Sequence, residues 1–173
     1  LFGDRMYISN ATGCSSIWGG PAATSPYTTN AKGQGPAWAN SLFEDNAEHG
    51  FGMLLGQNAI RSRLIDDAKA LVESDKASDE IKAACAAYLD TVNDGAKNGA
   101  AADALVEAAS KCDCDLCKDI VDNKAFLAKK SVWIFGGDGW AYDIGFGGVD
   151  HVLAAGQDVN IMVFDTEVYS NTG

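Results

Sequence analysis

The stretch SVWIFGGDGWAYDIGFGGVDHVLAAGQDVNIMVF, residues 131–164, decides the fold class of this chain. Two short and almost wholly apolar runs, at 131–135 and 159–164, flank a glycine-rich turn and a helical stretch at 149–155. Apolar runs joined by a helical crossover are typical of parallel strands that are buried on both faces. The stretch therefore predicts a βαβ unit within an α/β fold, in which helices flank a parallel sheet.

Outward from this unit, composition divides the chain into three parts. Residues 1–57 are rich in Gly, Ser, Thr, Pro and Trp after one strand-like run at 5–9, which predicts a loop-rich segment that carries binding residues. Residues 58–130 are rich in Ala, Leu, Lys, Asp and Glu at helical spacing, which predicts a helical insert. Residues 131–173 hold the βαβ unit and the segment after it.

Two local signals divide the predicted insert into helices. Ser78 is followed by two acidic residues and an apolar periodic run, which predicts a helix N-cap. The sequence NDGAKNG at 93–99 predicts a break between helices, because it is rich in glycine and asparagine.

Composition limits the class of protein. The chain has 173 residues, of which 47% are hydrophobic and 21% charged, which is ordinary for a soluble globular domain. A net charge of −11 argues against a nucleic-acid partner, and no apolar run suits a membrane span or a signal peptide. We therefore expect no nucleic acid, no membrane and a cytoplasmic location, or an organelle matrix. Because the chain starts at Leu1 without a methionine, we expect it to be an excerpt from a longer polypeptide.

The carboxyl ends of the two predicted strands point to a ligand site. Ligands of parallel sheets bind beyond these ends, so Asp138 and the residues after Phe164 are expected at the same edge. Residues 131–173 contain no lysine and no arginine. A phosphorylated cofactor at this edge would therefore need a divalent cation and backbone N–H groups, and Mg²⁺ suits carboxylate and phosphate oxygens.

The glycine-rich turn resembles a known cofactor motif. It does not match the dinucleotide fingerprint, because Tyr142 stands where the third glycine is needed. Gly-Asp-Gly followed by an oxygen ligand after the next strand resembles the thiamine diphosphate motif. That resemblance implies that Asp138, Thr166 and the backbone carbonyl of Val168 bind Mg²⁺. The usual paired asparagines are replaced here by Asp165 and Thr166.

A narrower resemblance extends over the first and last thirds of the chain. The segment GGDGWAYDIGFGGVDHVLAAGQDVNIMVFDTEVYSNTG is similar to the thiamine-binding segment of pyruvate:ferredoxin (flavodoxin) oxidoreductases. The segments LFGDRMYISNATGCSSIWGG and PAWANSLFEDNAEHGFGM resemble the same family, the first around an iron–sulfur ligand. The resemblance implies the C-terminal thiamine diphosphate-binding domain of these enzymes, present as a partial domain with a helical insert.

The same resemblance implies an activity and its site residues. The activity is CoA-dependent oxidative decarboxylation of pyruvate to acetyl-CoA and CO₂. Cys14 would ligate a 4Fe-4S cluster whose other ligands lie outside this chain, and Asn171 would lie at the reacting carbon as the catalytic residue. The cofactor would be lined by Gly137, Asp138, Gly139, Trp140, Thr166, Glu167, Val168, Tyr169, Ser170 and Asn171.

The resemblance also implies partners and leaves alternatives open. Electrons would pass through 4Fe-4S clusters to ferredoxin or flavodoxin, and the parent protein would be a homodimer in which this chain packs on the rest. The thiamine site could instead serve another 2-oxo acid, or a parent fused to a nicotinamide reductase (a pyruvate:NADP enzyme).

A third hypothesis is a non-catalytic metal-binding module built on Cys112, Cys114 and Cys117. A CxCxxC run suits thiolate binding of a metal, but no nearby His or fourth Cys completes a four-ligand set. On a helix Cys114 and Cys117 share a face while Cys112 points elsewhere. The resemblance assigns no role to these three cysteines, so they are expected to be ordinary helix residues. His49 and His151 are weak candidates, and His151, on the helix after the glycine-rich turn, is expected to pack or to face solvent rather than to catalyse.

Overall fold

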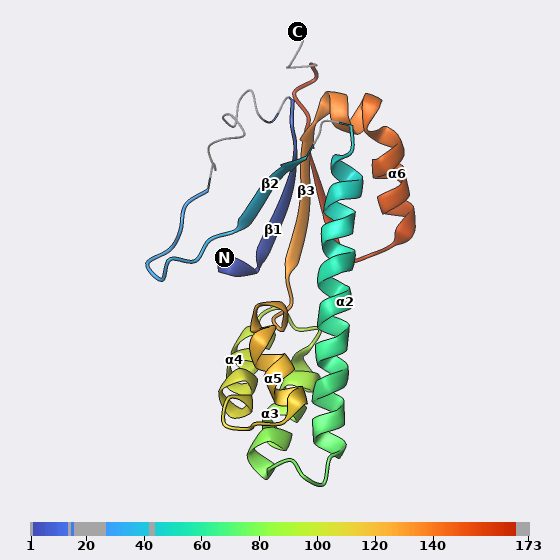
Figure 1. The fold of residues 1–173 in the computed structure, drawn as a ribbon. Helices are drawn as coiled ribbons and strands as arrows, with labels where there is room; N and C mark the ends of the chain where they lie inside the picture. Colours follow the sequence, from blue (N-terminus) through green and yellow to red (C-terminus); the bar gives the residue numbers. More distant parts are fainter. Residues whose placement is uncertain (1, 14, 16–26, 42–43, 169–173) are drawn as a thin grey trace. The chain divides into compact units, whose positions relative to one another are not determined.

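The structure, a computed structural model, describes residues 2–13, 15, 27–41 and 44–168. The chain divides into two compact units (Figure 1). Unit 1 comprises Leu1–Leu55 and Lys130–Gly173, and unit 2 comprises Gly56–Lys129. The long helix α2 (Asn46–Glu73) begins in unit 1 and continues into unit 2. None of the described helices is long and apolar enough to cross a membrane.

Unit 1 contains a four-stranded, fully parallel sheet. The strand order is β2-β1-β3-β4. The strands are β1 (Met6–Ala11), β2 (Ala37–Ser41), β3 (Ser131–Gly137) and β4 (Asn160–Phe164). The helix α6 (Phe146–Ala155) connects β3 to β4. The predicted α/β class with a parallel sheet flanked by helices is therefore confirmed, and all four carboxyl ends meet at one edge.

Helices α2 and α6 bury one face of this sheet. An added Cβ at Gly50 would lie only 2.5 Å from Cγ1 of Ile134, so the glycine lets the first turns of α2 approach β3 closely. The buried apolar residues of this core are Ala11, Ala47, Ile134, Trp140, Ala141, Val149 and Val152.

A buried asparagine at the start of α2 ties three strands together. The Asn46 Oδ1 atom accepts hydrogen bonds from the hydroxyl groups of Ser9 at 2.6 Å and Ser41 at 2.8 Å. Its Nδ2 donates to the carbonyl oxygen of Phe135 at 2.8 Å. The Asn46 side chain is fully buried, so these bonds replace the water it loses on folding. One side chain thus links β1, β2 and β3.

The opposite face of the sheet carries a row of aromatic rings. Phe135 packs edge to face against Trp133, with ring centroids 5.9 Å apart, and against Phe164, with centroids 5.5 Å apart. Alternation along β3 places Trp133 and Phe135 on this face, because Ile134 points to the α2 side.

Unit 2 is helical. Besides the later turns of α2, its helices are α3 (Asp79–Thr91), α4 (Asn98–Ala109), α5 (Asp115–Asp122) and the short 3₁₀ turn η2 (Lys124–Phe126). The Ser78 hydroxyl accepts the backbone N–H of Ile81, which confirms the predicted N-cap of α3. The predicted break at 93–99 is confirmed for residues 93–97, which lie between α3 and α4, whereas Asn98 and Gly99 already belong to α4.

Unit 2 has hydrogen bonds from a single arginine and an apolar core of its own. The Arg61 guanidinium donates to the backbone carbonyls of Leu127 at 2.9 Å and Val92 at 2.7 Å, and to Oδ1 of Asn98 at 3.1 Å. The buried residues of the core are Leu64, Ala68, Leu71, Ile81, Cys85, Tyr88, Ala102, Leu105, Ala108, Ala109, Cys117, Ile120 and Leu127.

Two expectations about the first part of the chain were incomplete. The segment AWANS forms the strand β2, although it was included in a loop-rich region, because it is short and has no β-branched residue. The first long helix begins at Asn46, well before residue 58, because Gly50, Gly52 and Gly56 obscure its helical pattern.

Candidate functional site

The site lies at the carboxyl edge of the sheet, between β3 and β4. Gly137 and Phe164 are paired in register, so the residues that follow them, Asp138 and Asp165, leave the sheet side by side. The Thr166 hydroxyl donates to Oδ2 of Asp138 at 2.8 Å. The Thr166 backbone N–H lies 3.2 Å from Oδ1 and 3.1 Å from Oδ2 of the same carboxylate. The edge expected from the sequence is thus the edge at which these residues meet.

Three hard oxygen atoms converge at this edge. The Thr166 Oγ1 atom lies 2.8 Å from a carboxylate oxygen of Asp138 and 3.2 Å from the carbonyl oxygen of Val168. Neighbouring ligands of an octahedral Mg²⁺ ion, each at about 2.1 Å from the metal, lie about 3 Å from one another. The chemistry of the three donors and the two spacings from Thr166 Oγ1 therefore fit a magnesium ion.

The backbone after β4 is held in an unusual conformation. Glu167 has a φ of 60°, in the left-handed region that residues with a side chain seldom adopt. Its N–H donates to Oδ1 of Asp138 at 3.2 Å and to Oδ1 of Asp165 at 3.0 Å. Such strain is typical of binding sites, where the surrounding contacts over-determine the backbone.

The Asp138 carboxylate is ionised over the physiological pH range. Partial burial opposes its charge, but hydrogen bonds from the hydroxyl and N–H of Thr166 favour it and hold the pKa at about 2. An ionised carboxylate is the form that ligates a divalent cation.

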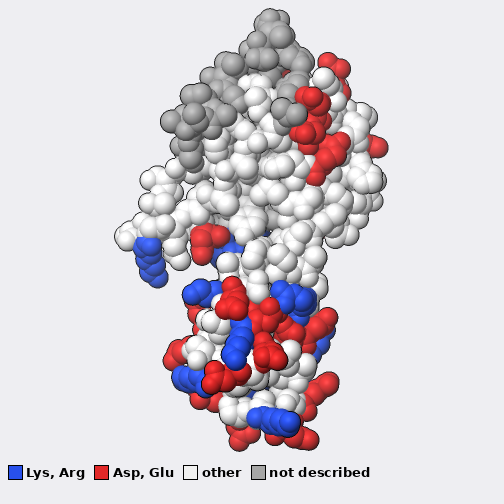
Figure 2. Space-filling model, in the orientation of Figure 1, with Lys and Arg blue, Asp and Glu red and all other residues white. Residues whose placement is uncertain are grey.

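A hollow of about 300 Å³ opens beside these atoms. It is lined by Asp138, Gly139, Tyr142, Asp143, Asp165, Glu167 and Val168. Four of these residues are acidic, and Figure 2 shows acidic side chains without a basic neighbour on this part of unit 1. An anionic ligand would need a cation here, because like charges repel. The sequence did not assign Tyr142 or Asp143 to the site, since nothing in their local pattern distinguishes them from exposed residues. Asp165 was noted only as the replacement of an asparagine of the motif, and it was not predicted to line the site.

The Tyr142 phenol extends the hydrogen-bond network of this hollow. Its hydroxyl donates to Oδ2 of Asp165 at 3.0 Å. That bond to a carboxylate raises the pKa of Tyr142, so the phenol stays protonated as a donor.

Trp140 lies beneath the site and is fully buried. It begins η3 (Trp140–Ile144), a π-helical turn of the kind often found at functional sites. An added Cβ would lie 2.2 Å from the indole at Gly136 and 2.4 Å from it at Gly145, so the two glycines make room for the ring. The ring thus packs against the backbone at Gly136, directly before Gly137, and the predicted cofactor contact of Trp140 stays a prediction.

Several predicted site residues lie outside the described residues. These are Cys14, Tyr169, Ser170 and Asn171. Their roles stay predictions.

The two histidines lie away from the acidic hollow. His49 Nδ1 is 2.6 Å from the hydroxyl of Ser9, and the ring of His151 packs edge to face on Phe51 at 6.0 Å. His151 is otherwise exposed, and neither histidine is among the residues that line the hollow, which agrees with the expectation that they are not catalytic.

The three clustered cysteines differ from expectation. The Sγ atoms of Cys112, Cys114 and Cys117 all lie within 4.8 Å of one another. The expectation that Cys112 points elsewhere is wrong, because only Cys117 lies within a helix, while Cys114 caps α5 and Cys112 lies in the preceding turn. Burial raises the pKa of Cys117, whereas the backbone N–H of Cys114 lowers the pKa of Cys112. Three converging thiols are a ligand set suited to metal ions and iron–sulfur clusters.

The fold and the edge site together define the chain as an α/β unit with a parallel sheet and an oxygen-lined site at its carboxyl edge. Over its whole length it is similar to part of the pyruvate-flavodoxin oxidoreductase of Klebsiella pneumoniae, at 58% identity over 175 residues. It is 53% identical to the pyruvate:ferredoxin oxidoreductase of Moorella thermoacetica over 182 residues. It is also 53% identical to the mitochondrial pyruvate dehydrogenase (NADP+) of Euglena gracilis over 175 residues.

These relatives are much longer proteins. The whole chain is covered in each case, but it spans 15% of the first two relatives and 10% of the third. No family model matches the chain.

Proposed function

We propose that this chain is the magnesium and thiamine diphosphate-binding part of a pyruvate:ferredoxin (flavodoxin) oxidoreductase. The observation that carries the proposal is the convergence of oxygen atoms from Asp138, Thr166 and Val168 at the carboxyl edge of the sheet. The similarity over the whole chain to enzymes named for pyruvate supports the same reading. On this proposal the sheet and its helices are part of a thiamine diphosphate-binding fold, and residues 58–130 are an insert within it.

The residues of the edge site have distinct roles in this proposal. Asp138 ligates Mg²⁺ through a carboxylate that is already ionised. Thr166 would ligate through a lone pair of its hydroxyl oxygen, whose proton remains available for a hydrogen bond. The strained backbone at Glu167 aims the Val168 carbonyl into the same site. Mg²⁺ then offsets the acidic lining of the hollow toward a diphosphate.

Thiamine diphosphate, when bound, supplies the electron sink for decarboxylation of a 2-oxo acid. The chain's own contribution is to bind and orient the diphosphate, with backbone groups of Gly137 and Gly139 at its side and the Trp140 ring packed against the preceding Gly136. Tyr169, Ser170 and Asn171 continue the same loop, and Asn171 is proposed to contact the substrate. Cys14 follows β1 in the sequence and is proposed to ligate a 4Fe-4S cluster, with the other ligands in the rest of a longer, homodimeric parent.

The first experiment measures cofactor binding by the full-length protein that carries this chain. Asp138→Asn and Thr166→Val should each weaken magnesium-dependent binding of thiamine diphosphate, by at least about 100-fold for Asp138, because a charge-assisted ligand is lost. Asp143→Asn is the matched control, since Asp143 lines the same hollow without joining the oxygen set, and it should bind almost as wild type does. Unchanged binding in Asp138→Asn would overturn the magnesium assignment.

The second experiment tests the substrate. We expect anaerobic reduction of a low-potential dye that depends on pyruvate, coenzyme A and thiamine diphosphate. Activity with a different 2-oxo acid alone would keep the cofactor site and remove pyruvate from the proposal.

An alternative concerns the electron acceptor. The similarity to the Euglena gracilis enzyme, whose name includes NADP+, favours a pyruvate:NADP enzyme as the second candidate. Reduction of NADP+ by the full-length protein without added ferredoxin or flavodoxin would select it.

A further inference from the structure

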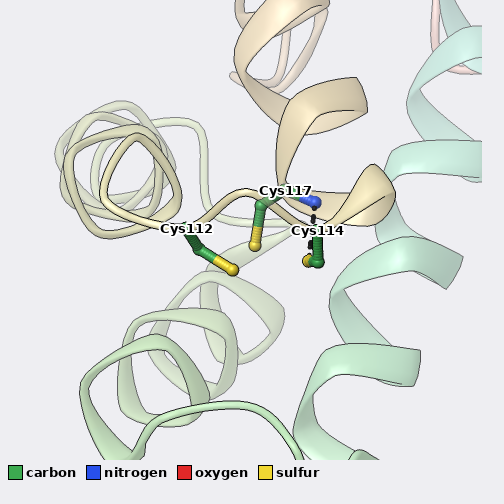
Figure 3. A group of neighbouring side chains, drawn as sticks. All are labelled: Cys112, Cys114 and Cys117. Carbon is green, nitrogen blue, oxygen red and sulfur yellow. Dashed lines mark hydrogen bonds between the residues drawn. The ribbon is translucent and has the colours of Figure 1, made fainter.

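A cluster of three thiols lies in unit 2 at the join between α4 and α5 (Figure 3). Helix α4 ends at Ala109, and Cys112 follows in the turn. Cys114 is the N-cap of α5, and Cys117 lies in its first turn. The turn brings Cys112 back over the start of α5, and its sulfur atom points toward that of Cys117 in Figure 3. The proposed thiamine site does not use these residues.

The spacing of the sulfur atoms matches a single metal ion. All three lie within 4.8 Å of one another. In a tetrahedral site with zinc–sulfur bonds of about 2.3 Å, ligand sulfur atoms are about 3.8 Å apart. The described positions therefore need only small side-chain rotations to ligate one ion. In a 4Fe-4S cluster each thiolate binds a different iron atom, so the sulfur atoms are held farther apart by the width of the cluster.

The backbone around the cluster is arranged for thiolate sulfur. The N–H of Cys117 donates to Sγ of Cys114 at 3.4 Å. The N–H of Cys114 donates to Sγ of Cys112. Donors aimed at ligand sulfur atoms orient them and stabilise their negative charge, as supporting hydrogen bonds do around metal sites.

The three cysteines of the cluster differ in their exposure to solvent. Cys117 is fully buried in the core of unit 2, Cys112 is half-buried and Cys114 is exposed. The buried and half-buried sulfur atoms anchor the site on the protein. A tetrahedral ion held by three cysteines requires a fourth ligand, and water can supply it because Cys114 is exposed to solvent.

We propose that Cys112, Cys114 and Cys117 bind one thiophilic metal ion, Zn²⁺, in a site separate from the thiamine site. The ion joins the end of α4 to the start of α5, so its function is to stabilise this corner of unit 2. The proposal is independent of the enzymatic activity, because none of the three thiols belongs to the acidic hollow.

The test measures zinc and iron per polypeptide in the full-length protein, purified without chelators and without oxygen. Wild type should contain about one zinc ion in this site. X-ray absorption spectroscopy at the zinc edge should show sulfur ligands at about 2.3 Å from the zinc. The triple variant Cys112→Ser, Cys114→Ser, Cys117→Ser should lose that zinc and keep its iron. Cys85→Ser is the matched control, because Cys85 is a buried thiol of the same unit outside the cluster.

The remaining outcomes overturn the proposal. Zinc that is absent from wild type, or unchanged in the triple variant, would remove the site. A loss of iron together with the three thiols would assign them to an iron–sulfur cluster instead. A disulfide between two of them in the anaerobic wild type would make the group a redox pair. The absorption measurement on wild type needs no variant, so poor folding of the triple variant would not leave the proposal undecided.

Discussion

Replacing Asn46 by alanine should open the sheet of unit 1 at its carboxyl edge. The change removes three side-chain hydrogen bonds, to Ser9, Ser41 and the Phe135 carbonyl. Each buried bond contributes about 1 kcal/mol net, so the expected loss is about 3 kcal/mol of opening free energy. That loss corresponds to a roughly 150-fold larger population of the open state.

Hydrogen–deuterium exchange of the full-length protein is the assay. Peptides that cover β1 and β3 should lose protection by about this factor, because their amides exchange through opening of the sheet. Asn98→Ala is the matched control. Asn98 is equally buried, but its described side-chain hydrogen bonds join it to Arg61, Thr91 and Lys129 within unit 2.

The expected control result is a loss of protection in α4 with β3 near wild type. A less than threefold change of β3 protection in Asn46→Ala would refute the reasoning that these bonds hold the strands together. Equal losses of β3 protection in Asn46→Ala and Asn98→Ala would refute the claim that the effect of the Asn46 hydrogen bonds is confined to unit 1.

Three further predictions concern single positions. Gly136→Ala should lower the thermal midpoint, with a loss of about 2 kcal/mol, because the new Cβ would lie 2.2 Å from the buried Trp140 ring; an unshifted midpoint and unchanged tryptophan fluorescence would contradict this. Ser78→Ala should reduce the exchange protection of the first turn of α3 by about 1 kcal/mol, whereas Ser78→Asp should retain it; equal effects of both would argue against a capping role. Arg61→Lys should reduce the exchange protection of unit 2 by about 2 kcal/mol in the same assay, since the single ammonium group of lysine cannot bond to the three acceptors that the planar guanidinium reaches. Wild-type protection in this variant would show that the positive charge alone suffices.

The strands that the sequence predicted well are those with continuous apolar runs. The pattern at 131–135 predicted β3, and its pairing with β4 in parallel followed from the helical crossover between them. The prediction that Asp138 and Thr166 lie close together then followed from one rule, that the carboxyl ends of neighbouring parallel strands lie at the same edge of the sheet. The strand β2 was missed because AWANS has neither length nor β-branched residues, so its strand conformation depends on pairing with β1.

Local spacing also failed where a chain turn decided the geometry. A helical reading of KCDCDLC separated Cys112 from the other two thiols, but the run crosses the boundary between a turn and α5. Two of the three hydrogen bonds of Asn46 could not be predicted either, because they join it to residues 37 and 89 positions away. Such long-range polar contacts have no signature in a single sequence.

The division of unit 1 into two sequence segments sets an order of events during synthesis. Strand β1 must wait for β3, its neighbour in the sheet, until all of unit 2 has been made. Unit 2 is contiguous, and its bond from Arg61 to the Leu127 carbonyl joins residues 66 positions apart, so its folding shortens the loop that β1 and β3 must close. Halving the length of a loop changes the free energy of loop closure by only about 0.6 kcal/mol. Early folding of unit 2 therefore affects when β1 and β3 pair more than it affects the final stability of the sheet. A nascent chain arrested before residue 131 would hold β1 and β2 without β3, so the edge of β1 that pairs with β3 would be exposed. Unpaired strand edges promote aggregation, so this stage of synthesis is the one most prone to aggregation and most in need of a chaperone.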